Sequence, residues 1–462
     1  MHKELKSCTR FLLSCVQQHR NRQRVLKSPF STCLTCFSTS SVNNKMTSRK
    51  FELAKRVQGT EKNVWVDISK LAVEQNSINL GQGFPDFMAP HDIVNCLKDT
   101  VNSDSPAVHQ YARSFGHPRL VKALAELYEP FLGRQIDPMT EILISVGAYG
   151  ALFCVIQGLV NPGDEVIIIE PFFDCYQPMV KAAGGTPVFV PLRPTKDGSV
   201  TSSADWKLDE GELSSKFNSK TKLIIVNTPN NPLGKVFTRE ELLVIANLCK
   251  KHDVVCVADE VYEWMTYNGN QHIKIATLPD MWERTVTIGS AGKTFSVTGW
   301  KIGWTVGPQH LVNCAQIMHQ NCTYNCPTPI QEAVARGLEL EKSRLGSPGS
   351  YLISLAASLK PKRDKLASVL EEVGMKPVIP EGGYFMMADY TSMEADVPES
   401  DEAKDFRFSK WMTINKKLTV IPPSAFYCKE HEHMAENYVR FCFIKEDSTL
   451  EKAANVLRHW KN

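Results

Sequence analysis

The stretch Thr287-Ile-Gly-Ser-Ala-Gly-Lys293-Thr-Phe-Ser-Val-Thr-Gly-Trp-Lys301-Ile-Gly-Trp304 decides how the rest of the sequence is interpreted. Lys293 follows a short β-branched run and a cluster of small residues, and Lys301 lies eight positions further on. Small residues let a ligand approach the backbone closely, and the Ser290 hydroxyl can bind an anion. A lysine confined at the end of a strand loses hydration, which lowers its pKa and makes it a usable Schiff-base nucleophile. An isolated lysine would more simply be a surface residue, so this interpretation depends on partners elsewhere in the chain.

Strand-like and helix-like patterns alternate on the N-terminal side of this stretch. Apolar runs at 142–146, 166–169, 222–226 and 254–258 predict strands, and the segments between them include amphipathic helical patterns. The alternation predicts an α/β fold whose mostly parallel sheet is covered on both faces. Ligands bind at the carboxyl ends of such strands. The residues at or just beyond those ends are Gly147, Phe173, Asn231, Asp259, Tyr262 and Lys293.

The length of 462 residues exceeds what one hydrophobic core usually serves, so we expect more than one domain. Beyond the sheet region, a long charged helical pattern at 333–372 and a β-rich segment at 438–443 predict a smaller α+β domain. We place a leader at 1–45, an N-terminal arm with part of the small domain at 46–90, a large domain at 91–338 and the small C-terminal domain at 339–462.

The N-terminal leader differs in charge from the rest of the chain. Residues 1–50 contain ten lysines and arginines against one acid, Glu4, and they are rich in serine and threonine. The apolar run Phe11–Leu13 is too short for a secretory signal. This composition predicts a mitochondrial transit peptide and a matrix location. The alternative is a basic tail on a cytosolic enzyme, and translation from Met46 would omit the leader.

The overall composition argues against several classes of protein. With 43% hydrophobic and 22% charged residues, the chain resembles an ordinary soluble globular protein. No run approaches the roughly 20 apolar residues of a membrane span, and the basic charges are not interleaved with aromatics as in a nucleic-acid-binding surface. The pair Cys33-Leu-Thr-Cys36 has no second pair or nearby histidine, so the sequence predicts no metal site.

The candidate residues together match the requirements of one cofactor. Pyridoxal phosphate needs an amine for its aldehyde, cations and N–H donors for its phosphate, a carboxylate for its ring nitrogen and donors for its phenolic oxygen. When bound, its protonated ring stabilises a substrate carbanion. The chain supplies these groups as Lys293, Lys301, Ser290, the helix start Gly147–Ala148, Asp259, Tyr262 and Asn231, with Phe173 available to stack on the ring.

Several motifs resemble those of known enzymes. Asn231-Pro-Leu-Gly234, Asp259-Glu-Val-Tyr262 and Ser290-Ala-Gly-Lys293 resemble the fold-type-I aminotransferases, in which a large domain carries the sheet and a smaller domain completes the site. Gly81-Gln-Gly-Phe-Pro-Asp86, Phe172-Phe-Asp-Cys-Tyr-Gln177 and Thr294-Phe-Ser-Val-Thr-Gly-Trp300 are similar to the kynurenine aminotransferase and glutamine transaminase K group, also known as cysteine-S-conjugate β-lyases. The resemblance covers roughly residues 50 to 460.

The resemblance implies a pyridoxal-phosphate-dependent aminotransferase. The expected donors are L-kynurenine, which would give kynurenic acid, and glutamine or other neutral and aromatic amino acids. A 2-oxo acid would be the acceptor, and β-lyase activity would accompany transamination. The resemblance also assigns roles to residues: Lys293 binds the aldehyde and moves the proton, Asp259 holds the ring nitrogen, Asn231 and Tyr262 bind the phenolic oxygen, Arg440 binds the substrate carboxylate, Gly83 closes over the substrate, Trp65 and Tyr149 shape the pocket, and Tyr111 reaches the phosphate of the other subunit in a homodimer.

Two alternatives remain open at this point. A protein that is primarily a cysteine-S-conjugate β-lyase would need the same residues as the transaminase. A non-enzymatic ligand sensor on the same fold would call for a DNA-binding module, and the leader shows no helix-turn-helix pattern. The group often has a histidine where this chain has Asn325, so the ranking of substrates stays open.

Overall fold

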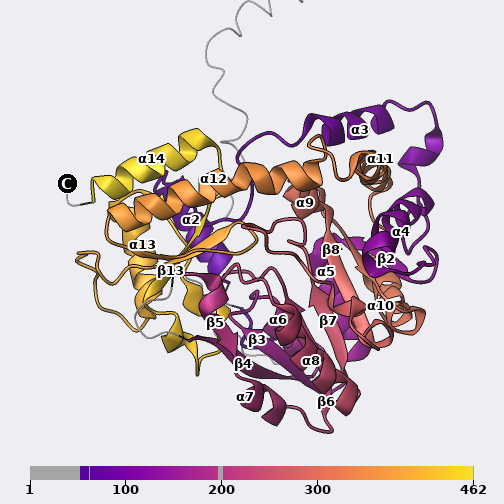
Figure 1. The fold of residues 1–462 in the computed structure, drawn as a ribbon, viewed down its shortest axis with the longest axis horizontal. Coiled ribbons are helices and arrows are strands. Elements are labelled where there is room, and N and C mark those ends of the chain that lie inside the picture. The colour runs from indigo at the N-terminus through magenta and orange to yellow at the C-terminus, as the bar shows by residue number, and fades with distance from the viewer. Residues whose placement is uncertain (1–51, 62, 196–200, 461–462) are drawn as a thin grey trace, which may run out of the picture. The chain divides into compact units, whose positions relative to one another are not determined.

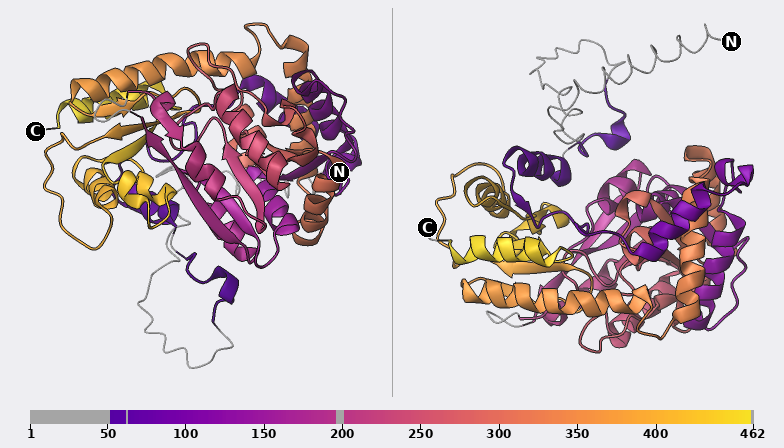
Figure 2. Two further views of the ribbon diagram at one scale, coloured as in Figure 1. Left: turned by 60° about the horizontal axis from the view of Figure 1, so that its bottom comes forward. Right: turned by 90° about the horizontal axis from the view of Figure 1, so that it is seen from above.

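The computed structural model describes residues 52–61, 63–195 and 201–460. The chain from Ala54 onward forms one compact unit, and the predicted transit peptide lies outside the described residues. Figures 1 and 2 show a twisted sheet flanked by helices on both faces, with a second group of helices and strands at the C-terminal end. No helix within the described residues combines the length and apolar character needed to cross a membrane.

The central sheet has eight strands in the order β2-β9-β8-β7-β6-β3-β4-β5. The pairs from β8 through β7, β6 and β3 to β4 are parallel, whereas β9 pairs antiparallel with β2 and β8, and β5 pairs antiparallel with β4. The predicted α/β class with a mostly parallel sheet is therefore confirmed. The strands are β2 (Ile142–Val146), β3 (Glu165–Glu170), β4 (Thr186–Pro194), β5 (Trp206–Leu208), β6 (Thr221–Asn227), β7 (Val255–Asp259), β8 (Thr285–Ser290) and β9 (Ile302–Val306).

The central strands are apolar on both faces because helices cover both. Ile168 and Ile225 point into a core formed with α5 (Gly147–Leu159), α6 (Tyr176–Ala182) and α10 (Gln309–Cys322). Their neighbours Ile167 and Ile224 point the other way, into a core that includes α8 (Arg239–His252). Adjacent strand residues face opposite sides of a sheet, so a continuous apolar run is what such a doubly covered strand requires.

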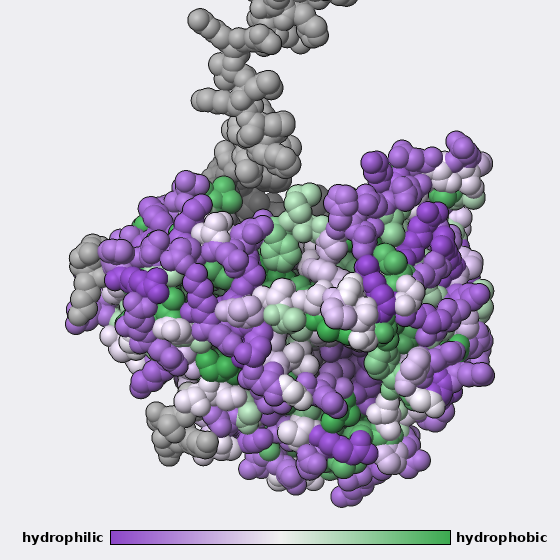
Figure 3. Space-filling model, turned by 45° about the horizontal axis from the view of Figure 1, so that its top comes forward, coloured by the Kyte–Doolittle hydropathy of each residue, from purple (hydrophilic) through white to green (hydrophobic). Residues whose placement is uncertain are grey.

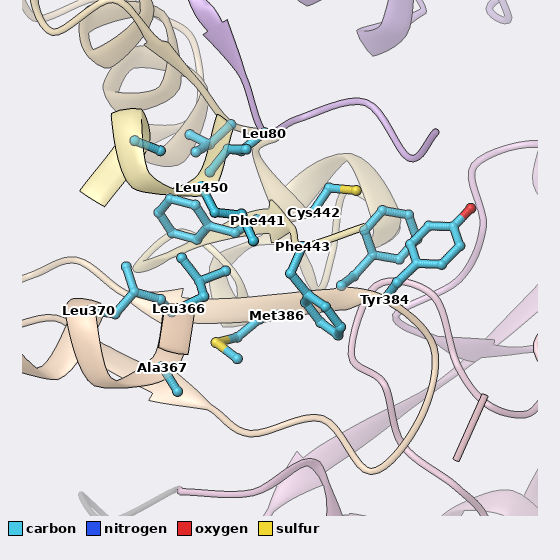
Figure 4. Packing of buried hydrophobic residues seen from close by; sticks show 14 of the residues in the cluster. Leu80, Leu366, Ala367, Leu370, Tyr384, Met386, Phe441, Cys442, Phe443 and Leu450 are labelled. Atoms are coloured by element: carbon cyan, nitrogen blue, oxygen red, sulfur yellow. The ribbon is translucent and has the colours of Figure 1, made fainter. Parts of the chain in front are cut away.

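A smaller antiparallel sheet lies at the C-terminal end. It has the order β10-β11-β13, with β10 (Lys376–Val378), β11 (Phe385–Asp389) and β13 (Tyr438–Cys442). Figure 4 shows its apolar cluster, in which Leu366 and Leu370 of α12 (Tyr351–Glu372) pack near Met386 and Phe441. The other helices here are α13 (Lys404–Asn415) and α14 (Asp447–Arg458), and β1 (Ile78–Asn79) pairs in parallel with β12 (Leu418–Thr419).

The long helical pattern predicted for 333–372 is two helices. The structure ends α11 (Thr328–Arg344) and begins α12 at Tyr351. Gly346 between them has a φ of 86°, a left-handed conformation that a helix cannot contain, and Pro348 follows it. The remaining helices are α2 (Val64–Glu74), α3 (His91–Val101), α4 (Pro118–Leu132), α7 (Glu210–Ser215) and the short α9 (Ala291–Thr294).

Candidate active site

A cavity of about 260 Å³ lies at the carboxyl ends of the central strands. The loops after β2, β3 and β6 contribute to its wall, as do the ends of β7 and β8. The structure therefore brings together side chains that lie far apart in the sequence. The predicted site residues that line it are Gly83, Gly147, Ala148, Tyr149, Phe173, Asn231, Asp259, Tyr262, Ser290, Lys293 and Lys301.

Lys293 lies on α9, immediately after the buried strand β8. Its Nζ donates a hydrogen bond of 2.6 Å to the Tyr384 hydroxyl, which in turn donates to the Gly83 carbonyl at 2.9 Å. Burial lowers the pKa of the Lys293 amine to about 8, and the nearby charges of Arg440 and Lys301 act in the same direction. With a pKa of about 8, roughly a tenth of this amine is unprotonated at pH 7, and this fraction can act as a nucleophile.

Asp259 ends β7, and its buried carboxylate borders the cavity. Burial raises its pKa to about 6, although a hydrogen bond of 2.5 Å from the Tyr176 hydroxyl opposes the shift. Asn227 fixes the strand end because its Nδ2 donates to the Asp259 backbone carbonyl at 2.9 Å. Within the described part of the chain, Asp259 forms no ion pair. A buried carboxylate that lacks a cation suits the protonated ring nitrogen of pyridoxal phosphate.

The turn from β2 into α5 brings the backbone of Gly147 close to Lys301. Gly147 begins α5 with a φ of 68°, and a Cβ atom there would lie 3.2 Å from Lys301 Nζ. A Cβ atom on Gly303 would lie 2.3 Å from the Gly147 carbonyl carbon, so both backbones can approach only without side chains. Ser290 also borders this space. Free N–H groups at a helix start together with a lysine ammonium suit a phosphate group.

Arg440 lies on β13 and is completely buried, although an arginine in an alternating strand usually faces solvent. Its Nη1 donates to Asn231 Oδ1 at 2.8 Å and its Nη2 to the Gly81 carbonyl at 2.7 Å, whereas its Nε has no partner. The guanidinium carbon lies 3.8 Å from the Phe385 ring centroid. Burial lowers its pKa to about 10, so the side chain remains charged at neutral pH.

Three predicted site residues, Arg440, Trp65 and Tyr111, are not among those that line the cavity. Arg440 contacts the cavity-lining Asn231, and the Trp65 ring centroid lies 5.1 Å from the Arg440 guanidinium carbon. Tyr111 is 82% exposed and packs edge-on against Tyr324, with 5.6 Å between ring centroids. The structure thus does not bring Tyr111 to the cavity of its own chain.

Several residues at the site were not expected from the sequence. Tyr384 contacts Lys293, Tyr176 contacts Asp259, and Phe385 lines the cavity and stacks on Arg440. In Figure 4 Tyr384 lies at the edge of the labelled apolar cluster, and its hydroxyl points away from the other labelled side chains. The sequence offered two signals for these residues, the run Gly382-Gly-Tyr-Phe385 and the position of Tyr176 within the motif Phe172–Gln177. Neither signal indicated a contact, because hydrogen bonds between distant segments leave no local pattern.

Comparisons with known proteins agree with this geometry. The model of the family "Aminotransferase class I and II" matches residues 75–457. The chain is 54% identical over 436 residues to kynurenine–oxoglutarate transaminase 3 of Mus musculus, covering 93% of this chain and 95% of that protein. It is 50% identical to kynurenine–oxoglutarate transaminase 1 of Homo sapiens, covering 88% and 98%.

Solved structures show the same fold. N-succinyldiaminopimelate aminotransferase from Mycobacterium tuberculosis superposes with a TM-score of 0.80 at 34% sequence identity, covering 88% of this chain and 100% of that structure. The half-buried Lys293, the buried Asp259 carboxylate and the glycine turn beside Lys301 therefore occur on the fold of known aminotransferases. The chain belongs to the class I and II aminotransferases and is a pyridoxal-phosphate-dependent aminotransferase.

Proposed function

We propose that the enzyme transfers the amino group of L-kynurenine, glutamine and other neutral or aromatic amino acids to a 2-oxo acid. The observation that carries this proposal is the buried guanidinium of Arg440, which forms no ion pair in the described part of the chain and whose Nε lacks a partner. Burying such a charge is costly unless a ligand supplies the opposite charge. A substrate α-carboxylate would do so, and its two oxygens suit the planar fork of an arginine.

The walls of the cavity support a neutral or aromatic side chain. Tyr149, Leu152, Phe173 and Phe385 present apolar surface to the space. Lys293 and Lys301 are the cations among the described cavity-lining residues, and both are assigned to the cofactor. The wall therefore offers no further cation to a second carboxylate on the amino donor. The relatives named above as kynurenine–oxoglutarate transaminases are consistent with this choice.

Pyridoxal phosphate, when bound, supplies an aldehyde and a ring that accepts the electrons left by the departing Cα proton. The residues of this chain hold and orient the reactants around it. Asp259 would stabilise positive charge at the ring nitrogen, Lys301 and the start of α5 would hold the phosphate, and Arg440 would fix the amino acid by its carboxylate. The Lys293 amine would take the proton from the substrate Cα and carry it across the site.

The hydrogen bonds around Lys293 favour this proton transfer. The Tyr384 hydroxyl accepts from Nζ and donates to the Gly83 carbonyl, so the amine is held near the backbone segment that the resemblance places over the substrate. That segment helps to exclude water, which strengthens the charge interactions of the site. Tyr384 thus positions the amine.

β-Elimination from cysteine S-conjugates belongs to the same proposal as a side activity. Loss of the Cα proton to Lys293 is common to both reactions. Where Cβ carries a good leaving group, such as a thiolate, that group is then expelled and elimination takes place instead of amino transfer. The same residues serve both reactions, so the substrate decides the outcome.

We also propose a homodimer and mitochondrial targeting. Tyr111 is a large, exposed side chain outside its own cavity, as expected of a residue that completes the site of a second copy. The charge bias of residues 1–50 supports targeting. Sedimentation of the purified enzyme would test the dimer, and loss of cofactor affinity in Tyr111→Ala would test the shared site. N-terminal sequencing of the enzyme isolated from its cells would test removal of the leader.

The transamination proposal is tested by the absorption spectrum of the purified enzyme. Adding kynurenine or glutamine should bleach the absorption of the lysine-bound cofactor, and a 2-oxo acid should restore it. Lys293→Ala should bind cofactor but show no turnover. A spectrum unchanged by these donors, with pyruvate and ammonia formed only from cysteine S-conjugates, would instead establish a lyase.

A further inference from the structure

Three side chains of metal-ligand type meet outside the cofactor cavity. Glu170 is the last residue of β3, and Cys428 and His431 follow the short helical turn η8 (Pro423–Phe426). One ligand atom from each lies within 4.8 Å of the other two. Glu170 and Cys428 are buried, whereas the His431 side chain is 18% exposed. A carboxylate, a thiol and an imidazole therefore share one small site with one side open to water.

The three groups converge on one point. His431 Nδ1 lies 3.5 Å from Cys428 Sγ, and the same nitrogen hydrogen-bonds to Glu170 Oε2. In a catalytic relay from an acid through a histidine to a nucleophile, the histidine uses one ring nitrogen for each partner. Here Glu170 and Cys428 both contact Nδ1 of His431, so the cluster does not have the geometry of such a relay. A metal site instead requires donor atoms around a common centre. Zinc bonds of about 2.3 Å to sulfur and about 2.0 Å to nitrogen place these two atoms roughly 3.5 Å apart in a tetrahedron, which matches the separation of Nδ1 and Sγ. The His431 and Glu170 donors are directly hydrogen-bonded, so they must separate to admit the ion between them.

A second cluster in the described residues provides a contrast. Glu260, Glu263 and His272 also lie within ligand distance of one another. The Lys274 ammonium occupies that cluster, donating to Glu260 at 2.8 Å and also to Glu263. Its cation is already supplied by the chain, so the cluster is an internal ion-pair network.

The Glu170 cluster has no such lysine. Within the described ranges the only ion pair of Glu170 is with His431, a group that can itself bind a metal. Its other carboxylate oxygen accepts from the Cys428 backbone N–H, which fixes the carboxylate beside the thiol. A buried carboxylate, a thiol and an imidazole suit a borderline-soft divalent ion.

We propose that Glu170, Cys428 and His431 bind one zinc ion or a chemically similar divalent cation. A water molecule on the exposed side of His431 would complete the tetrahedron. Binding displaces the proton of the Cys428 thiol and the proton held between His431 Nδ1 and Glu170, both of which pass to solvent, and no oxidation or reduction is involved. This site is separate from the cofactor cavity.

A metal there would restrain a segment that packs against Arg440. The Phe172 backbone N–H donates to the Phe426 carbonyl at 2.9 Å, beside the proposed ligands. The Phe426 ring centroid lies 5.2 Å from the guanidinium carbon of Arg440 and 6.1 Å from the Trp65 ring. A cross-link between the end of β3 and the segment after η8 would therefore restrain a side chain that packs on the carboxylate-binding arginine.

Cobalt is the direct probe of this site. We would treat the holoenzyme with a chelator, remove the chelator and titrate with Co²⁺, following the visible bands of four-coordinate cobalt on the long-wavelength side of the cofactor absorption. One Co²⁺ per chain is expected, and Zn²⁺ should displace it. Hydrogen exchange at residues 423–434 should slow when the metal is bound.

Two pairs of variants make the test decisive. Cys428→Ser and His431→Asn should each weaken cobalt affinity by about 100-fold or more, since loss of an outer-sphere partner alone commonly costs 10–100-fold. Cys314→Ser and His433→Asn, which alter a thiol and an imidazole outside the cluster, should leave it unchanged. Circular dichroism and cofactor content would show that each variant is folded. Absence of stoichiometric cobalt binding, or bands that persist in Cys428→Ser, would overturn the proposal.

Discussion

Replacing Arg440 by lysine is the sharpest test of substrate binding, because it keeps the charge and removes the fork. The guanidinium already donates one hydrogen bond to Asn231 and one to Gly81, so the substrate carboxylate must share its five N–H groups with these partners. A lysine ammonium has three N–H groups at a single point and cannot present two parallel bonds to a carboxylate.

The expected loss follows from one missing charge-assisted hydrogen bond. Such a bond contributes about 1.5–3 kcal/mol, and each 1.4 kcal/mol corresponds to a factor of about ten. Arg440→Lys should therefore lower kcat/KM for a neutral amino acid by about 10- to 150-fold. Cofactor content after dialysis should change little, because Arg440 has no assigned cofactor contact of its own and Asn231, to which it donates, is only one of the residues assigned to the cofactor.

A second buried arginine provides the matched control. Arg363 is 2% exposed, lies over the Tyr267 ring at 4.8 Å and donates to the Pro380 carbonyl, outside the cavity. Arg363→Lys should lower the melting temperature with little effect on kcat/KM. If Arg440→Lys retained full kcat/KM, or if both variants lost it equally, Arg440 would not be the carboxylate ligand.

Three further predictions concern the residues around the amine, the loop that covers it and the acid stability of the fold. Tyr384→Phe removes the nearer of the two acceptors of the Lys293 ammonium and leaves the Gly83 carbonyl at 3.4 Å, so the pKa of this amine should fall below about 8. The pH dependence of amine labelling in cofactor-free enzyme would show this, and an unchanged pKa would argue against the hydrogen bond to Tyr384. Gly83→Ala would place a Cβ atom 2.4 Å from Phe385 Cζ, so KM for the amino acid should rise by about tenfold or more, as steady-state kinetics would measure; wild-type KM would mean that this loop does not close over the substrate. Burial alone would raise the pKa of the Glu260 carboxyl, but its cationic partners Lys274 and His272 lower this pKa to about 2. The carboxylate therefore stabilises the fold fully above its unfolded pKa near 4.5, and this stabilisation is lost as the pH falls toward 2. Urea unfolding across this pH range should show the decline in the free energy of unfolding, and a flat profile would contradict the prediction.

The order of the central strands could not be predicted from the sequence, although the strands themselves could. The apolar runs and the turn residues after them predicted the strands and the edge of the sheet at which a ligand binds. They did not predict that β9 would lie antiparallel between β2 and β8, because strand order depends on long-range pairing. The break at Gly346 was also missed, since a helical pattern on both sides concealed a two-helix arrangement.

The sequence by itself determined the chemistry of this protein, because lysine, aspartate and glycine-rich turns at strand ends are local patterns with few alternative uses. It therefore indicated the cofactor and the residues that line its cavity. Only the tertiary structure decided which groups Lys293 and Asp259 contact, that Arg440 is buried, and that Glu170 meets Cys428 and His431 across more than 250 positions of sequence. Those contacts depend on the packing of separate elements, and packing leaves no periodic signal in any single segment.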